Sequence, residues 1–165
     1  MLVALKEHLV LLAVEEGKDF SRQVGARLAT KHLKKTDVSR CINLILLMPD
    51  LIRTVRLWSV DSRLPKEVKR LNGFLLTYLY YPADFLPEHE HGLFGYIDDA
   101  YLIGRVYHMA RQFKTDGPIG AAELSGTLDL IRRIIPKESR IIDRMIDEIK
   151  EGRSDLFEYM MSKQS

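Results

Sequence analysis

The sequence has few cysteines, little net charge and no long uncharged run, and each shortage excludes a class of protein. The single cysteine, Cys41, excludes an internal disulfide and a zinc site built from several cysteines. A net charge of +2, from 25 basic and 23 acidic residues, is too small to predict a nucleic-acid partner. The longest uncharged run in the middle of the chain, 71–83, is too short for a spanning helix, which needs about 20 apolar residues.

The familiar catalytic and nucleotide-binding motifs are missing as well. The chain contains no phosphate-binding loop, no G-x-G-x-x-G, no H-E-x-x-H and no G-x-S-x-G. Cys41 lies in an apolar run, Cys-Ile-Asn-Leu-Ile-Leu-Leu-Met, which indicates a buried and unreactive thiol rather than a nucleophile. We therefore assign no catalytic residue and favour a non-catalytic protein, although the sequence alone leaves enzyme activity open.

The chain does have the composition of an ordinary soluble domain. Its 165 residues are 46% hydrophobic and 29% charged, so it can bury a core without disulfides or metal ions. The first apolar stretch is interrupted by Lys6, Glu7 and His8, which argues against a secretory signal. A cytoplasmic location is therefore expected, either in solution or at the periphery of a membrane.

Apolar residues repeat at helical spacing along the chain, and no stretch keeps the period of two that a strand needs. We predict an all-α fold, a globular bundle of about 8–9 short helices with a central helical hairpin. Glycine and proline commonly mark helix ends, so one helix is expected to end at Gly17 and another to begin at Pro49. The remaining helices are expected over 19–35, 36–48, 65–81, 96–113, 123–135, 137–150 and from Ser154.

The turn Asp116-Gly117-Pro118 is the clearest internal boundary. We predict a single helical domain over 1–165, made of N-terminal helices in 1–48, a core in 49–113 and a helical extension in 119–162. Met160 and Met161 lie on one side of the last expected helix, where they can pack on the body of the protein or on a second chain. A homo-oligomer therefore stays open.

Acidic and histidine side chains concentrate in one segment, 81–99, and no Lys or Arg occurs from 71 to 104. The potential ligands in this segment are Asp84, Glu88, His89, Glu90, His91, Asp98 and Asp99. Carboxylate and imidazole ligands suit a divalent cation, which would relieve the repulsion between the carboxylates. The candidate metal ligands are Asp84, Glu88, His91, Asp98 and Asp99.

The same segment also fits a purely structural role. Asp98 and Asp99 are expected in the first turn of a helix, where carboxylates accept hydrogen bonds from free N–H groups. Pro82 and Pro87 would stop one helix and stiffen the turn, and Gly95 would permit a sharp entry into the next helix. Residue spacing does not decide between a cation site and a hydrogen-bonded clasp.

Two half-motifs in this segment carry a family resemblance. They are Tyr-Pro-Ala-Asp-Phe-Leu-Pro-Glu at 81–88 and Gly-Tyr-Ile-Asp-Asp at 95–99, preceded by Leu-Pro-Lys-Glu-Val-Lys at 64–69. With them, the run from about 49 to 110 resembles the YkvA-like proteins, a mostly bacterial family of unknown function. Glu88 departs from the aspartate usual in that family, and His89-Glu90-His91-Gly92 replaces its usual Phe-Ile-Pro. The resemblance implies a small helical protein, in some members membrane-associated, and supplies neither a reaction nor a substrate.

Two functions remain open at this point. The first is a non-catalytic binding or scaffolding module for a protein partner or an anionic membrane surface. It rests on the aromatic-rich segment 71–86 and on the basic residues of 53–70, although helical-period aromatics are more often core. The second is a metal-binding protein or metal-dependent hydrolase at 84–99, with Glu88 or Glu90 as the general base.

Overall fold

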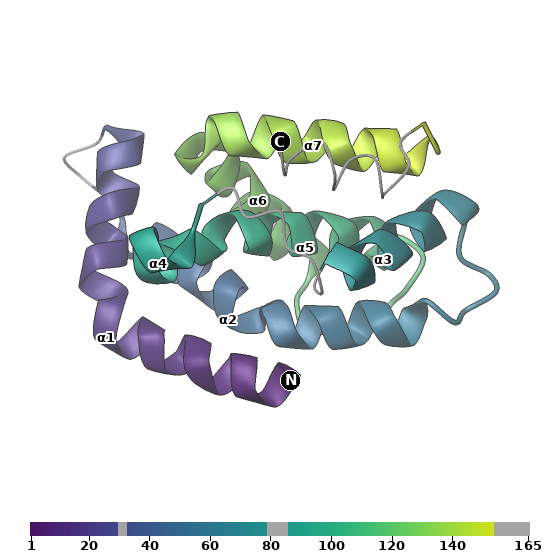
Figure 1. The fold of residues 1–165 in the computed structure, drawn as a ribbon, viewed down its shortest axis with the longest axis horizontal. Helices are drawn as coiled ribbons and strands as arrows, with labels where there is room; N and C mark the ends of the chain where they lie inside the picture. Colours follow the sequence, from purple (N-terminus) through teal and green to yellow (C-terminus); the bar gives the residue numbers. More distant parts are fainter. Residues whose placement is uncertain (30–32, 79–85, 154–165) are drawn as a thin grey trace.

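The computed structural model describes residues 1–29, 33–78 and 86–153, and every regular element in these ranges is helical (Figure 1). The elements are α1 (Leu2–Leu28), α2 (Lys35–Trp58), α3 (Lys66–Tyr78), α4 (Glu88–His91), the 3-10 helix η1 (Gly92–Tyr96), α5 (Ile97–Arg111), α6 (Ala121–Ile134) and α7 (Pro136–Lys150). The predicted all-α class is therefore confirmed.

The predicted number of 8–9 helices is too high for the described part of the chain, which holds six long helices and the short α4 and η1. Two helices continue through residues that were expected to divide them, because Gly17 lies inside α1 and Pro49 lies inside α2. The helix expected from Ser154 lies outside the described residues.

Tertiary packing explains why these two helices do not end where the sequence suggests. In α1, Leu9 before Gly17 and Phe20 after it are both buried in the same core. In α2, Pro49 is itself buried among core residues on both sides. The helix-propensity cost, about 1 kcal/mol for glycine and about 3 kcal/mol for proline, is outweighed by this burial. Figure 1 shows that α1 changes direction along its length, so it has two arms, and we refer to the part of α1 before Gly17 as its first arm.

No helix was predicted between those expected at 65–81 and 96–113, yet the described residues 88–96 of this connection form α4 and η1. The sequence shows no helical period there, because η1 is held by its packing on the distant α1, and α4 is held by its packing on η1.

Helix α5 lies at the centre of the bundle and contacts α2, α3, α6 and α7 (Figure 1). Its buried residues include Tyr101, Val106 and Tyr107, none of which is exposed to solvent. Among the described helices, none combines the length and the apolar character that crossing a lipid bilayer requires.

Candidate functional site

The predicted acidic turn is described in part. Asp84 and Pro82 lie outside the described residues. The described candidate ligands are Glu88, His91, Asp98 and Asp99. Glu88 and His91 are the first and last residues of α4, whereas the two aspartates lie in the first turn of α5.

The two aspartates tie the start of α5 to the rest of this turn. The carboxylate of Asp98 is buried, with 1% of the residue exposed, and its Oδ2 accepts a hydrogen bond from the backbone N–H of Leu86 at 3.2 Å. Asp99 Oδ1 accepts a hydrogen bond from the hydroxyl of the buried Tyr78 at 2.9 Å. The turn is therefore joined both to its own backbone and to the end of α3.

Pro87 and Gly95 shape the turn at two points. The carbonyl oxygen of Pro87 accepts hydrogen bonds from the backbone N–H groups of Glu90 and His91, both at 3.1 Å, and α4 begins there. A Cβ atom at Gly95 would lie 2.7 Å from Cα of Glu88, which is closer than real Cβ contacts come. The backbones of α4 and η1 approach this closely because residue 95 has no side chain.

Helix α1 holds the same segment from the other side, a role that sequence reasoning missed. Glu16 Oε2 accepts a hydrogen bond from the backbone N–H of Leu93 at 2.6 Å, and Gln23 Nε2 donates to the carbonyl oxygen of His91 at 3.2 Å. The rings of Phe20 and Phe94 are 5.7 Å apart. These partners lie far apart in sequence, so no local pattern could have predicted them.

The described residues do not complete a metal site. Within 1–29, 33–78 and 86–153, no group of three or more His, Cys, Asp or Glu side chains is arranged to hold a metal ion. A cation site at this turn would therefore need Asp84 as well as the described carboxylates, and it stays a prediction.

A stability measurement separates the two interpretations of the turn. We expect Asp98→Ala to lower the free energy of unfolding by about 2 kcal/mol, because Asp98 is buried and hydrogen-bonded. The thermal midpoint, followed by circular dichroism, should fall by about 4–8 °C. The fall should be the same with excess chelator as with added Mg²⁺, Mn²⁺ or Zn²⁺. Glu90→Ala, which changes an exposed residue of the same turn, should leave the thermal midpoint nearly unchanged. A metal that raises the thermal midpoint of the wild type but not that of Asp98→Ala would contradict the hydrogen-bonded clasp at Asp98 and support the cation site.

A second polar cluster joins α5, α6 and α7. The hydroxyl of the buried Tyr101 donates to the carboxylate of Asp143, with distances of 2.9 and 2.8 Å to its two oxygens. Arg105 Nε donates to Asp143 Oδ1 at 2.9 Å, and Arg132 Nε donates to the Tyr101 hydroxyl oxygen at 2.6 Å. The Asp143 carboxylate of α7 thus links α7 to side chains of both α5 and α6.

The electrostatics of this cluster keep its tyrosine neutral. Burial raises the pKa of Tyr101 well above its usual range, and the hydrogen bond to Asp143 adds to this shift. The pKa of the neighbouring His108 is lowered, first by burial and then by the charges of Arg105 and Arg132. Because Tyr101 and both arginines are engaged with one another or with Asp143, we interpret the cluster as an interhelical clasp rather than a reactive site.

Sequence reasoning missed this cluster as well. Tyr101 and Arg105 lie one helical turn apart on α5, and Asp143 interrupts the apolar residues of α7. These are weak signals, because they do not indicate that the two helices meet.

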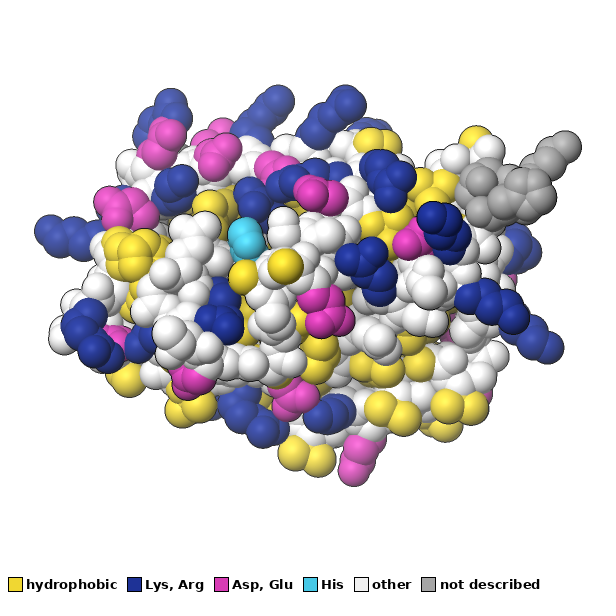
Figure 2. All heavy atoms as spheres, turned by 180° about the vertical axis from the view of Figure 1, so that it is seen from behind, with side chains coloured by type: hydrophobic (Ala, Val, Ile, Leu, Met, Phe, Trp, Pro, Cys, Tyr) yellow, Lys and Arg dark blue, Asp and Glu magenta, His cyan; other side chains and the backbone are white. Residues whose placement is uncertain are grey.

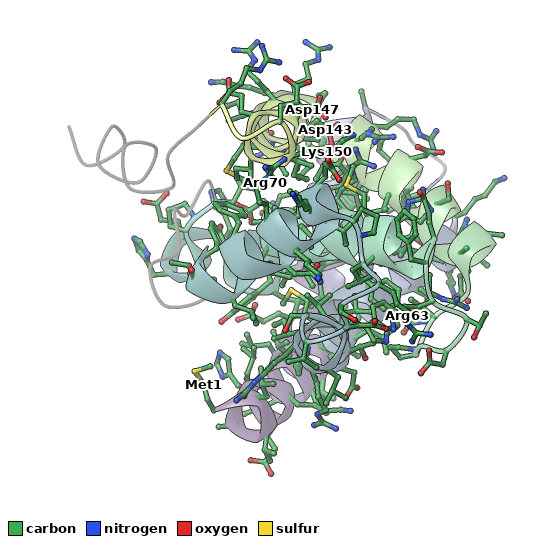
Figure 3. All side chains as sticks on the ribbon, turned by 90° about the vertical axis from the view of Figure 1, so that its right-hand side faces the viewer. Met1, Arg63, Arg70, Asp143, Asp147 and Lys150 are labelled. Atoms are coloured by element: carbon green, nitrogen blue, oxygen red, sulfur yellow. The ribbon has the colours of Figure 1, made fainter. Side chains whose placement is uncertain are left out.

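In Figure 3, Asp143 lies at the end of the molecule that also carries Arg70, and Met1 lies towards the opposite end.

The first arm of α1 carries an exposed apolar face. The exposed fractions are 65% for Val3, 48% for Val10, 55% for Leu11 and 80% for Val14. A shallow hollow on this face is lined by Lys6, Glu7, Val10, Leu11 and Val14. Figure 2 shows apolar side chains along the lower edge of the molecule, where Figure 1 places this arm.

No protein-family model, curated protein or solved structure matches the chain, and the resemblance to the YkvA-like family therefore stays a prediction.

Proposed function

We propose that the protein is a non-catalytic binding module, and that it binds a protein partner on the exposed apolar face of α1. The observation that carries this proposal is the exposure of Val3, Val10, Leu11 and Val14 on one face of one helix. Single exposed apolar residues are ordinary on protein surfaces, whereas a group on one face is typical of an interaction site.

The opposite face of the same arm strengthens the argument. Leu9 is fully buried, and Leu2, Leu5 and Leu12 pack against the core. The arm is therefore apolar on two faces, and only one of them is covered within the described residues. A partner on the second face would cover its apolar side chains as the bundle covers those of the first.

Two observations favour a protein partner over a membrane surface. The exposed face of the arm carries Glu7 as well as Lys6, whereas helices that lie on anionic membranes have mainly basic flanks. The aromatic segment that suggested a membrane surface is largely core where it is described, since Phe74, Tyr78 and Leu86 are each 4% exposed.

The proposal is tested by site-specific photo-cross-linking of the full chain in cells. We would place a photoreactive amino acid at Val14 and, as a matched control, at Val60, which are 80% and 86% exposed. The Val14 position should give a covalent adduct of defined mass, the Val60 position should not, and Leu11→Ser in the same chain should remove the adduct. Equal labelling from both positions, or none from Val14, would overturn the proposal. An adduct with lipid alone would mean that the face binds a membrane rather than a protein.

A further inference from the structure

We infer that one end of the molecule is a surface for double-stranded nucleic acid, which it contacts through the phosphates without reading the sequence of bases. This inference goes beyond the proposed function and concerns a different surface from the exposed apolar face of α1. It starts from the distribution of charge, because a net charge of +2 for the whole chain can conceal a strongly basic end.

The end in question is formed where α1 ends, where α2 begins and where α6 leads into α7. Arg27 Nη1 near the end of α1 lies 3.5 Å from Glu138 Oε1 in the first turn of α7. The guanidinium of Arg40, in the second turn of α2, lies directly beside Gly126 of α6. In Figure 1, the end of α1 and the start of α7 lie together on the left of the molecule.

This end, which we call the basic end, carries six Lys or Arg side chains that form no ion pair within 1–29, 33–78 and 86–153. They are Lys34, Lys35, Arg40, Arg133, Lys137 and Arg140. Among the acidic residues here, Glu138 is already paired with Arg27. Asp129 is already paired with Arg132, which leaves Asp37 to offset the six bases. Figure 2 shows the basic end on the right, with many Lys and Arg side chains and few Asp or Glu.

The spacing of these bases suits the charge density of a duplex. Arg40 lies beside Gly126, and Arg133 follows seven residues later on the same helix, about 10 Å along its axis. A duplex presents one negative charge per about 1.7 Å of its length, so about six charges fall within that distance. Several of the bases can therefore meet phosphates at the same time.

The basic end lacks what the other anionic partners need. A membrane surface or a protein partner is normally held by exposed apolar anchors, and among the large apolar side chains exposed in the described residues only Ile141, at 38%, adjoins these bases. A single strand stacks its bases on exposed aromatic rings, whereas the Phe94 ring under Arg27 is 1% exposed. Contacts between basic side chains and the phosphates of a duplex need neither feature.

Fluorescence anisotropy of a short labelled duplex, titrated with the full chain, tests this inference. Duplex DNA and duplex RNA of one sequence are the two arms, because both present phosphates. At about 50 mM salt we expect a dissociation constant on the order of 10 µM. Contact with about four phosphates should give a slope of about −4 when the logarithm of the association constant is plotted against that of the salt concentration. Arg133→Gln combined with Lys137→Gln should raise the dissociation constant by at least about tenfold and bring the slope to about −2.

The matched control removes two exposed bases far from the basic end. Arg56→Gln combined with Lys66→Gln changes the net charge equally, at the end of α2 and the start of α3, and should leave both the dissociation constant and the slope nearly unchanged. Circular dichroism should show every variant folded. Equal losses in the two double variants, or no binding at about 50 mM salt, would overturn the inference.

Competition separates the remaining partners. An unlabelled duplex of another sequence should displace the labelled one, and a preference for DNA or RNA would support the inference and identify the source of the phosphates. Polyglutamate that competes equally well, charge for charge, would assign the basic end to an acidic polypeptide and overturn the inference. Sedimentation with vesicles of mixed neutral and anionic lipid, without duplex binding, would assign it to a membrane and overturn it as well. Leu11→Ser should leave duplex binding unchanged, so a failure here and a failure of the proposed function are distinguishable.

Discussion

Replacing Asp143 with alanine is expected to lower the free energy of unfolding by about 3 kcal/mol, one of the two largest single effects that we predict. The side chains of Asp143 and Arg105 are only 29% and 19% exposed. Water can therefore replace few of the hydrogen bonds that the carboxylate accepts. Its removal leaves the Arg105 guanidinium without its 2.9 Å partner and the Tyr101 hydroxyl without its acceptor. The cost should therefore approach that of breaking a buried ion pair.

Urea unfolding followed by circular dichroism measures this loss, and a thermal scan should show a fall of about 6–12 °C. Asp129→Ala is the matched control, because Asp129 also binds Arg132, at 2.8 Å, but its side chain is 65% exposed. We expect that variant to lose less than about 1 kcal/mol, as exposed ion pairs usually do. Equal losses in the two variants would show that the cluster does not hold α5, α6 and α7 together.

The Asp143 cluster also shows why part of this structure escapes prediction from sequence. The helical class follows from local periodicity. The contact between Tyr101 and Asp143 joins residues 42 positions apart, and it exists only because α5 packs on α7. Side-chain pairing of this kind depends on tertiary arrangement, which the spacing of residues along one helix does not contain.

The helix boundaries illustrate the opposite error, in which a local signal is overruled. Gly17 and Pro49 are genuine local breakers, yet the apolar residues on both sides of each belong to one core. The exposed face of α1 could not be predicted from the sequence for a related reason. Val3, Val10 and Val14 widen the apolar stripe in the sequence, and only the packing of α1 on the bundle separates the covered side from the exposed one.

Gly95→Ala is expected to lower the free energy of unfolding by about 3 kcal/mol, although it adds a single methyl group. The new Cβ would lie 2.7 Å from Cα of Glu88 and 3.0 Å from the carbonyl oxygen of Leu86. Both are backbone atoms, so a change of rotamer cannot relieve the overlap, and the turn before α5 must move. That movement would also disturb the hydrogen bond between Asp98 and Leu86.

A second glycine separates this steric effect from the general effect of replacing glycine. Gly73 lies in the middle of α3, and a Cβ there would have no neighbour within 4 Å. Gly73→Ala should therefore raise the free energy of unfolding by about 0.5–1 kcal/mol, because alanine favours a helix and restricts the unfolded chain. Urea unfolding of the two variants should thus give shifts of opposite sign. A Gly95→Ala protein as stable as Gly73→Ala would mean that the close approach of α4 and η1 is not a fixed feature of the folded turn.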